Sequence, residues 1–578
     1  MKKARPFIAA TFSFLLAFVL FRFSGFSLPY PELLFLPVFG GLFVLIDKSL
    51  ALPFDKQRAL FALLFGIALA ASFVIGRKIH LWQEPYYEAF RVSDLLYGAA
   101  LSLIFFCAAW LLLAAAEKKS LPLRPVPRKK GSWLWISLIL FLAWIPYFLI
   151  YYPGIVSIDS YESLTQCLGL HVYYNHHPLL FTLLIRICMT PGLWLGNINI
   201  AVAGFTLVQM TIFALMLGYS VGWLREKGAP RAAVWITGGF FALNPVIAIY
   251  SITMWKDVLF AGWILLLVLF LWDAAQSRGA CLRGIKGVGK LVFLSLGVAF
   301  SRNNGRYVLI LVFLALLIAF RKEWKRLLAV SLSVLIGVFA VQGPLYSALG
   351  VQKGNFAESV GVPLQQIAFS LKENGRVTEE QKEFLDQIMP TEQIIALYNP
   401  ATCDDIKFDH AFQNEFLNTH KAEFLKVWLE MLPANFASYV KAWLMNTLGY
   451  YHIGTGNWVV FLGMQKNEIG LERHDLVREA TGLDLNPAVT RGVDVLWHLP
   501  VIENLFSMAS LFWAAVLAAL ALIRQKRARF LPALIPLLGV WATLMIATPI
   551  YCEFRYMLSF HLAEPFLFLF PFLREKEN

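Results

Sequence analysis

The chain has 578 residues, of which 58% are hydrophobic and only 15% are charged, and its formal net charge is +13. A soluble protein carries about 25% charged residues, so this composition excludes a soluble enzyme or a soluble binding module. Several apolar runs reach the ~20 residues that a helix needs to cross a bilayer, which indicates an all-α polytopic membrane protein. Basic cytoplasmic loops account for the positive charge, which therefore gives no indication of nucleic-acid binding.

The first apolar run follows Lys2, Lys3 and Arg5, as in a signal peptide. No small-residue cleavage site follows it and further apolar runs come later, so we expect a retained helix. In chain order, the sequence predicts fourteen membrane helices, near 7–25, 33–47, 59–76, 95–116, 133–150, 199–222, 232–250, 257–275, 288–301, 306–320, 327–345, 505–523, 529–549 and 556–573.

Lys and Arg residues predict the orientation of these helices. With the N-terminus inside, every inward loop is rich in Lys and Arg (47–58, 117–130, 225–231, 277–290, 321–326 and 524–529). Such an asymmetry marks the cytoplasmic side. The segment Leu179–Leu195 is also apolar, but Arg186 and Pro191 interrupt it, and a span there would invert every later loop. We therefore expect a surface or half-inserted helix, and a plasma-membrane protein with both termini in the cytoplasm.

The predicted elements divide the chain into four parts. Residues 1–130 form an N-terminal four-helix membrane module, and residues 131–345 form a membrane core with a first outer loop at 151–198. Residues 346–504 form a mainly helical extracytoplasmic domain, and residues 505–578 form C-terminal transmembrane helices. Helices are predicted in the extracytoplasmic domain at Thr378–Met389, where Thr378 resembles a cap, and at His420–Leu432 and Asn435–Leu448. No alternating strand pattern and no Gly-rich phosphate loop is present.

The segment Tyr151–Pro178, on the predicted outer side, concentrates acids and imidazoles. It contains Asp159, Glu162, His171, His176 and His177, and no Lys or Arg. Such groups are costly to hold beside lipid and usually have a function there. Two roles are open for Asp159, and they need not exclude each other. It could act as a general base, or it could cap the helix that follows. His176 and His177 either line a site or simply precede a helix whose first position is Pro178.

Three further clusters lie where predicted helices meet the outer surface. They are Trp255-Lys256-Asp257, Arg302-Asn303-Asn304-Gly305 and Glu553-Phe554-Arg555-Tyr556. Several cations around one point could bind a phosphate through charge-assisted hydrogen bonds. The alternative is that these cations reach toward lipid headgroups and form local ion pairs, with Asp257 neutralising Lys256 and Glu553 beside Arg555.

This layout resembles the GT-C superfamily of integral-membrane glycosyltransferases, which includes protein mannosyltransferases and lipid A aminoarabinose transferases. More closely, it resembles an uncharacterised bacterial membrane family of that architecture. The resemblance runs over about 130–575 in short motifs. They are Pro153-Gly154 with Ile158-Asp159-Ser160, His176-His177-Pro178, Trp255-Lys256-Asp257, Arg302-Asn303-Asn304-Gly305, Pro363-Leu364-Gln365-Gln366 and Glu553-Phe554-Arg555-Tyr556.

The resemblance implies transfer of a sugar from a polyprenyl-phosphate donor to an envelope glycan, lipid or protein. Asp159 would be the base that activates the acceptor hydroxyl, and His176 and His177 would line the site. Lys256, Arg302 and Arg555 would hold the lipid phosphate, and Asp257, Asn303 and Glu553 complete the candidate substrate-binding residues.

Some members of the superfamily bind a divalent cation through acidic loop residues. The first outer loop of this chain has no Asp-x-Asp or Glu-x-Asp pair, so metal dependence is open. Glu162 would be the second carboxylate, and a surface role for it is the alternative.

Two other functions remain open. A transporter or flippase for an envelope lipid or polymer would show polar residues at mid-span and broken helices. A non-catalytic scaffold of envelope assembly would show only surface ion pairs. A disulfide between Cys403 and Cys552, both on the predicted outer side, is also open.

Overall fold

A computed structural model describes residues 4–23, 31–81, 86–118, 121, 131–456, 458–499, 503 and 507–573. In this part of the chain, helices dominate, and the one sheet pairs β1 (Ile79–His80) with β2 (Tyr86–Tyr87) in antiparallel register. The prediction of an all-α protein is therefore confirmed.

Eight helices among the described residues are long and apolar enough to cross a membrane. They are α1 (Arg5–Phe23), α2 (Pro31–Ala51), α3 (Lys56–Gly76), α4 (Val92–Lys118), α5 (Ser132–Ile150), α8 (Ile198–Glu226), α11 (Lys256–Gln276) and the segment Arg321–Ala348, which contains α14 (Trp324–Ala340) and α15 (Tyr346–Ala348). Their length and composition make the chain a membrane protein.

One further pair of helices passes the same test of length and composition only when the two are taken together. Helices α9 (Arg231–Leu243) and α10 (Pro245–Ile252) meet at a 53° bend. Pro245 has no N–H to continue the helical ladder, and a proline disfavours helical geometry in the residue before it. Asn244 accordingly has φ −72° and ψ 112°, and its side chain accepts a hydrogen bond from the backbone N–H of Val246.

The other five predicted spans coincide with shorter helices, so a count of fourteen is not reached. These helices are α12 (Ile285–Ser301), α13 (Gly305–Ala319), α26 (Met508–Arg524), α27 (Ile535–Ala547) and α28 (Leu558–Leu569), of 17, 15, 17, 13 and 12 residues. Helix α7 (Leu179–Trp194) has 16 residues and covers the segment for which a surface position is predicted.

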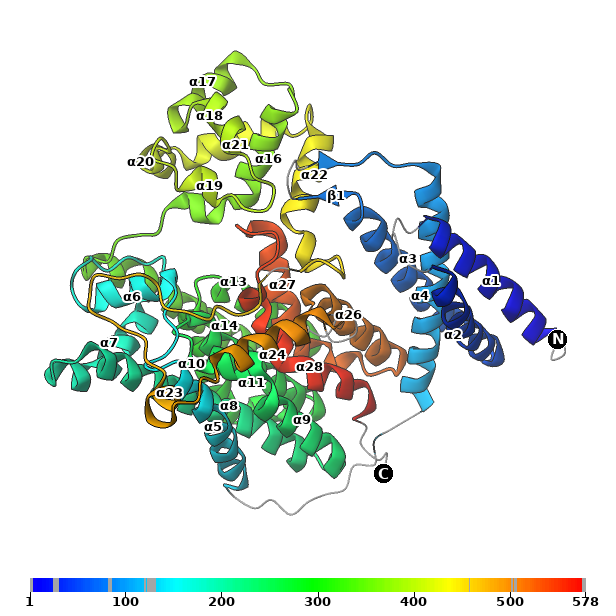
Figure 1. The fold of residues 1–578 in the computed structure, drawn as a ribbon, viewed down its shortest axis with the longest axis horizontal. Coiled ribbons are helices and arrows are strands. Elements are labelled where there is room, and N and C mark those ends of the chain that lie inside the picture. Colours follow the sequence, from blue (N-terminus) through cyan, green and yellow to red (C-terminus); the bar gives the residue numbers. More distant parts are fainter. Residues whose placement is uncertain are drawn as a thin grey trace.

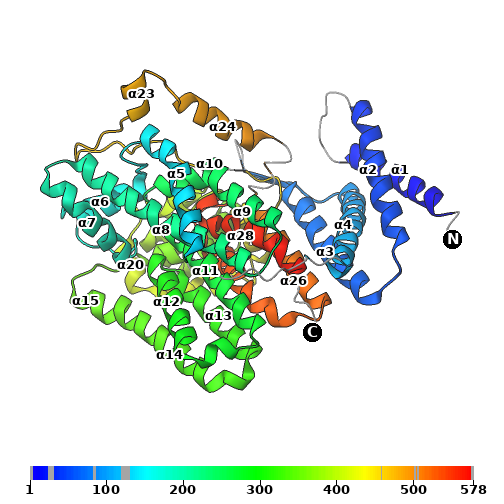
Figure 2. The same cartoon turned by 90° about the horizontal axis from the view of Figure 1, so that it is seen from below.

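The helices form three groups (Figure 1). Helices α1 to α4 lie together at one side, and α5 to α14 with α26 to α28 form a central bundle. We use the name upper cluster for α16 (Gly361–Lys372), α17 (Glu379–Ile388), α18 (Thr391–Leu397), α19 (Asp404–Lys407), α20 (Asn414–Thr419), α21 (Lys421–Met431) and α22 (Phe436–Asn446). The upper cluster lies above the central bundle in Figure 1. The view from below shows α23 (Leu476–Thr481) and α24 (Asn486–His498) along one edge of the central bundle (Figure 2).

Short helices complete the chain. They are α6 (Ile158–Cys167), η1 (Ala280–Arg283), η2 (Arg321–Glu323), η3 (Val341–Leu345), η4 (Phe356–Ser359), η5 (Leu448–Tyr450), η6 (Ala528–Ala533), η7 (Phe554–Met557) and η8 (Phe570–Phe572).

The three helices predicted in the upper cluster are confirmed as α17, α21 and α22. The start of α17 is explained by its cap, because Thr378 and Gln381 form a reciprocal capping box there. Cys403 and Cys552 are not joined by a disulfide in the structure. Close helix contacts in the membrane part depend on small residues. A Cβ on Gly66 of α3 would lie 2.7 Å from the backbone oxygen of Ser102 in α4.

Candidate functional site

A cavity of about 690 Å³ is lined by residues of the central bundle together with residues of the upper cluster. Its size is within the range of small-molecule sites. The residues that line it are Ser157, Ile158, Asp159, Glu162, Gln166, Tyr174, His176, His177, Trp255, Asn355, Glu358, Asp404, Phe408, Trp458, Phe461, Gln465 and Arg555.

The loop before α6 is fastened to the end of α10, and this places Asp159. The backbone N–H of Ile155 donates to the oxygen of Ile252 over 2.9 Å, and that of Met254 donates to the oxygen of Ile155 over 3.0 Å. Gly154 has φ +134°, and a Cβ there would lie 2.4 Å from Thr206 Oγ1, so the turn requires glycine.

Two serines join the start of α6 to the Trp255 motif. Trp255 Nε1 donates to Ser157 Oγ, and Ser160 Oγ donates to the backbone oxygen of Met254 over 2.7 Å. The Asp159 and Trp255 motifs, separate in the sequence, therefore share one wall of the cavity.

Asp159 contacts a cation and does not cap α6. Its Oδ2 lies 2.5 Å from Arg555 Nη1, and the N-cap position belongs to Ser157. The capping interpretation is therefore wrong, because Asp159 lies within the first turn of α6 and its carboxylate pairs with a guanidinium. Burial alone would raise the pKa of Asp159, but the charges of Arg555 and Lys256 outweigh it and hold this pKa well below its usual range. Asp159 is consequently ionised at neutral pH.

Arg555 also contacts a second carboxylate. Its Nε lies 3.0 Å from Glu553 Oε1, and Glu553 is only 1% exposed. The guanidinium carbon lies 5.0 Å from the Trp255 ring centroid and 5.2 Å from that of Tyr556. Burial raises the pKa of Glu553 to about 7, against the opposing charge of Arg555.

Lys256 contacts a histidine, whereas the alternative interpretation of the sequence paired it with Asp257. Its Nζ lies 3.0 Å from His177 Nδ1. An ammonium can only donate, so Nδ1 of His177 accepts and Nε2 carries the proton. Burial, with Lys256 nearby, lowers the pKa of His176 to about 4 and that of His177 well below its usual value. Both imidazoles are therefore neutral at pH 7.

Asp257 pairs instead with Arg302, behind the cavity wall. Asp257 Oδ1 lies 2.9 Å from Arg302 Nη1, and the Arg302 guanidinium carbon lies 4.5 Å from the Tyr556 ring centroid. Asn303 donates through Nδ2 to the backbone oxygens of Asn175 and His176, at 2.7 and 3.3 Å. The contacts of Asn303 hold the loop that carries His176 and His177, which we call the histidine loop, in place.

Five of the ten predicted site residues line the cavity: Asp159, Glu162, His176, His177 and Arg555. The others, Lys256, Asp257, Arg302, Asn303 and Glu553, contact the lining residues or pair behind them. Direct binding of a substrate by these five stays a prediction. Helix α7 begins at Leu179, one residue after the predicted start at Pro178.

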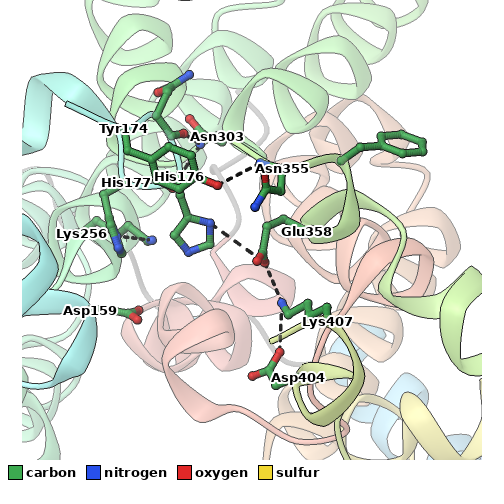
Figure 3. A network of polar contacts seen from close by, with 12 residues as sticks. Asp159, Tyr174, His176, His177, Lys256, Asn303, Asn355, Glu358, Asp404 and Lys407 are labelled. Atoms are coloured by element: carbon green, nitrogen blue, oxygen red, sulfur yellow. Dashed lines mark hydrogen bonds and ion pairs between the residues drawn. The ribbon is translucent and has the colours of Figure 1, made fainter. Parts of the chain in front are cut away.

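The upper side of the cavity contains polar residues that the sequence interpretation missed (Figure 3). Lys407 Nζ lies 2.6 Å from Glu358 Oε2 and 2.9 Å from Asp404 Oδ1. Glu358 Oε2 in turn lies 4.0 Å from His176 Nδ1, so charged groups extend from the upper cluster to the histidines. No motif marks these residues, because they belong to a stretch where charged residues are common and unremarkable.

The carboxylates do not gather around a cation site. Among the described residues, no group of three His, Cys, Asp or Glu side chains could hold a metal ion. Asp159 faces Arg555, and Glu162 Oε2 lies 3.4 Å from His171 Nδ1 with nearly half of its side chain exposed. Dependence on a divalent cation stays a prediction, and the contacts that Asp159 and Glu162 make do not support it.

Comparison with known proteins gives one match. A family model described as "Family of unknown function (DUF6020)" matches residues 170–578. This range includes the histidine loop, the upper cluster and Arg555, and it begins after Asp159. Neither the curated proteins nor the solved structures contain a match to the chain.

Proposed function

This chain belongs to the DUF6020 family, and we propose that it is a membrane glycosyltransferase with GT-C-like architecture. It would transfer a sugar from a polyprenyl-phosphate donor to a glycan, lipid or protein of the cell envelope. The proposal depends on one observation above the others. Asp159 and Arg555, an ionised carboxylate and a guanidinium, face one cavity next to the membrane helices.

The proposed reaction needs a base and a phosphate ligand. The acceptor hydroxyl oxygen forms a bond to the anomeric carbon of the sugar, and the bond from that carbon to the phosphate oxygen breaks. The phosphate leaves with the bonding electrons as polyprenyl phosphate. Asp159 takes the hydroxyl proton and later releases it to water. Arg555 stabilises the charge on the leaving phosphate, since charge-assisted hydrogen bonds to an oxyanion are strong.

His177 would contribute a hydrogen-bond donor. Because Lys256 occupies Nδ1, the Nε2–H is the free donor of this neutral ring. In the proposed complex it would bind a phosphate or hydroxyl oxygen. His176 is neutral as well and 32% of its side chain is exposed, so it could accept a hydrogen bond from a sugar hydroxyl.

The membrane position fits such a donor. A polyprenyl tail stays in the bilayer, and its phosphate lies at the surface where the cavity would open. We propose the orientation that the basic loops indicate, with both termini cytoplasmic and the cavity extracytoplasmic. This orientation requires all fourteen predicted helices to cross, with the five shorter ones included.

A transfer assay tests the proposed function. Purified protein in lipid is given a panel of polyprenyl-phosphate sugars together with envelope glycans, lipids and peptides. We expect one donor to lose its sugar to an acceptor at a rate well above that of protein-free vesicles. A folded protein that transfers no sugar from any donor would contradict the proposal.

The acceptor would bind at the exposed aromatic residues of the lining. Phe408 and Trp458 are 66% and 43% exposed although both are large and aromatic, and Asp404 lines the same cavity. Aromatic faces with a few oriented polar groups are typical of small-molecule sites.

We expect Asp404→Asn to raise the acceptor KM about tenfold, which corresponds to the loss of one charge-assisted hydrogen bond of ~1.4 kcal/mol. The donor KM should stay unchanged. Asp405→Asn is the matched control, because Asp405 is exposed and its carboxylate accepts a hydrogen bond from the Asn399 side chain. Equal acceptor KM values for both variants would remove Asp404 from the acceptor site.

A transporter is the second candidate, and a buried polar group supports it. His561 Nε2 lies 2.9 Å from Asn244 Nδ2 at the α9–α10 bend, and His561 Nδ1 lies 3.1 Å from Glu564 Oε2. Ionisable residues among membrane helices and interrupted helices are both features of transporters. Movement of a labelled polyprenyl-phosphate lipid between vesicle leaflets, without any sugar transfer, would favour this function.

A further inference from the structure

Asp159 cannot act as a base in the arrangement that the structure shows. Its Oδ2 is held at 2.5 Å by Arg555, and a carboxylate bound to a guanidinium binds a proton weakly. The same guanidinium is the phosphate ligand of the proposed reaction. The two roles are compatible only if Arg555 leaves Asp159 when the phosphate arrives.

The two carboxylates on Arg555 differ in their access to the cavity. Asp159 lines the cavity and 30% of its side chain is exposed, whereas Glu553 is 1% exposed and does not line it. An anion in the cavity therefore competes with Asp159 for the guanidinium and leaves the Glu553 contact intact. In the structure, the ring centroids of Trp255 and Tyr556 lie 5.0 and 5.2 Å from the Arg555 guanidinium carbon.

We propose that Glu553 is a positioning residue that retains Arg555 while a phosphate-bearing ligand draws the guanidinium away from Asp159, so that ligand binding itself frees the base. The release of Asp159 requires only an anionic ligand. Its use as a base rests on the proposed glycosyl transfer.

Charges around both carboxylates set the direction of the pH effect. The cations Arg555 and Lys256 act on Asp159, beside the neutral rings of His177 and His176, and Arg555, Asp257, Asp159 and Arg302 act on Glu553. When Arg555 turns to the phosphate, Asp159 loses its nearest cation and gains a nearby anion. Both changes raise the pKa of Asp159 in the complex above its value in the free protein.

The pH dependence of wild-type transfer tests the release. The acid limb of kcat/KM reports groups of the free enzyme and that of kcat reports groups of the complex. We expect the acid limb of kcat to lie at least one pH unit above that of kcat/KM. Coinciding limbs in an active enzyme would overturn the inference and leave the proposed function standing.

The variant Glu553→Gln tests the positioning role. Without the Glu553 charge, Arg555 stays closer to Asp159 in the complex, so we expect kcat to fall about tenfold and the two limbs to approach each other. Glu553→Asp should restore the separation in part. A purely structural role would change yield or rate without moving the limbs.

Glu117→Gln is the matched control. Glu117 also contacts two arginines, Arg58 and Arg524, at 3.0 and 2.9 Å, and it lies in α4 far along the chain from the cavity residues. The limbs should keep their wild-type separation in this variant. A shift equal to that of Glu553→Gln would overturn the positioning role.

A binding measurement separates this inference from the proposed function. Polyprenyl phosphate without a sugar is added in vesicles, with phosphate-free vesicles and inorganic phosphate as the other arms. Movement of Arg555 away from Trp255 should change the fluorescence emission of Trp255. The variant Trp255→Phe identifies this emission, because it lacks the Trp255 signal. A change on adding either phosphate supports the release even if no sugar is ever transferred. Bound polyprenyl phosphate without this change overturns it.

Discussion

The variant Asp159→Asn should lower the rate of sugar transfer by about 10²–10⁴-fold, the usual contribution of a general base. Asparagine keeps the shape of the side chain but cannot take the acceptor proton. It also releases Arg555, since the 2.5 Å contact loses its charge. We therefore expect the donor to bind as well as in the wild type or more tightly, and the loss to appear in kcat.

Single-turnover transfer and donor binding, measured on the same preparation, check this expectation. Glu162→Gln is the comparison, because Glu162 lines the same cavity one helical turn away and contacts His171. Its rate should change no more than a few-fold. Full transfer by Asp159→Asn would exclude Asp159 as the base, whatever the fate of the donor.

The variant Arg302→Met should destabilise the fold by about 3–5 kcal/mol, the cost of breaking a buried ion pair from one side. Asp257 is 1% exposed, so the substitution leaves a carboxylate without its cation in a water-poor position. The double variant Arg302→Met with Asp257→Leu should recover most of this loss, because neither charge then remains buried.

Thermal unfolding of all variants in one detergent checks this prediction. Lys426→Met serves as the control, because its pair with Glu430 at 3.8 Å is exposed and such pairs contribute ~0–1 kcal/mol. Equal unfolding temperatures for Arg302→Met and Lys426→Met would show that the Asp257 carboxylate does not need its cation.

The sequence interpretation succeeded where a property belongs to one continuous segment. Apolar runs identified the long membrane helices, because the free energy of transferring a segment into lipid depends on its own composition. The Thr378 cap and the amphipathic segments after it likewise determined α17, α21 and α22. Local hydrogen bonds at a helix start are encoded by neighbouring residues, so they can be read without a fold.

The sequence interpretation was less successful with charge pairs. Asp257 is adjacent to Lys256, yet it pairs with Arg302, and Lys256 turns to His177. Neighbours at the start of a helix point in different directions, so adjacency does not decide which side chains meet. The contact of Asp159 with Arg555 spans 396 positions, and only the packing of α6, α11 and η7 brings these two together.

By itself, the sequence determined that this chain is an all-α membrane protein and that its acids, imidazoles and cations gather near helix ends. The tertiary structure alone decided that Asp159, His176, His177 and Arg555 share one cavity, and that Glu358 and Asp404, both paired with Lys407, line it too. The physical reason is the range of the interactions. Burial of apolar surface and helix capping act within a segment, whereas ion pairs require atoms within about 4 Å, and that distance depends on how distant segments pack.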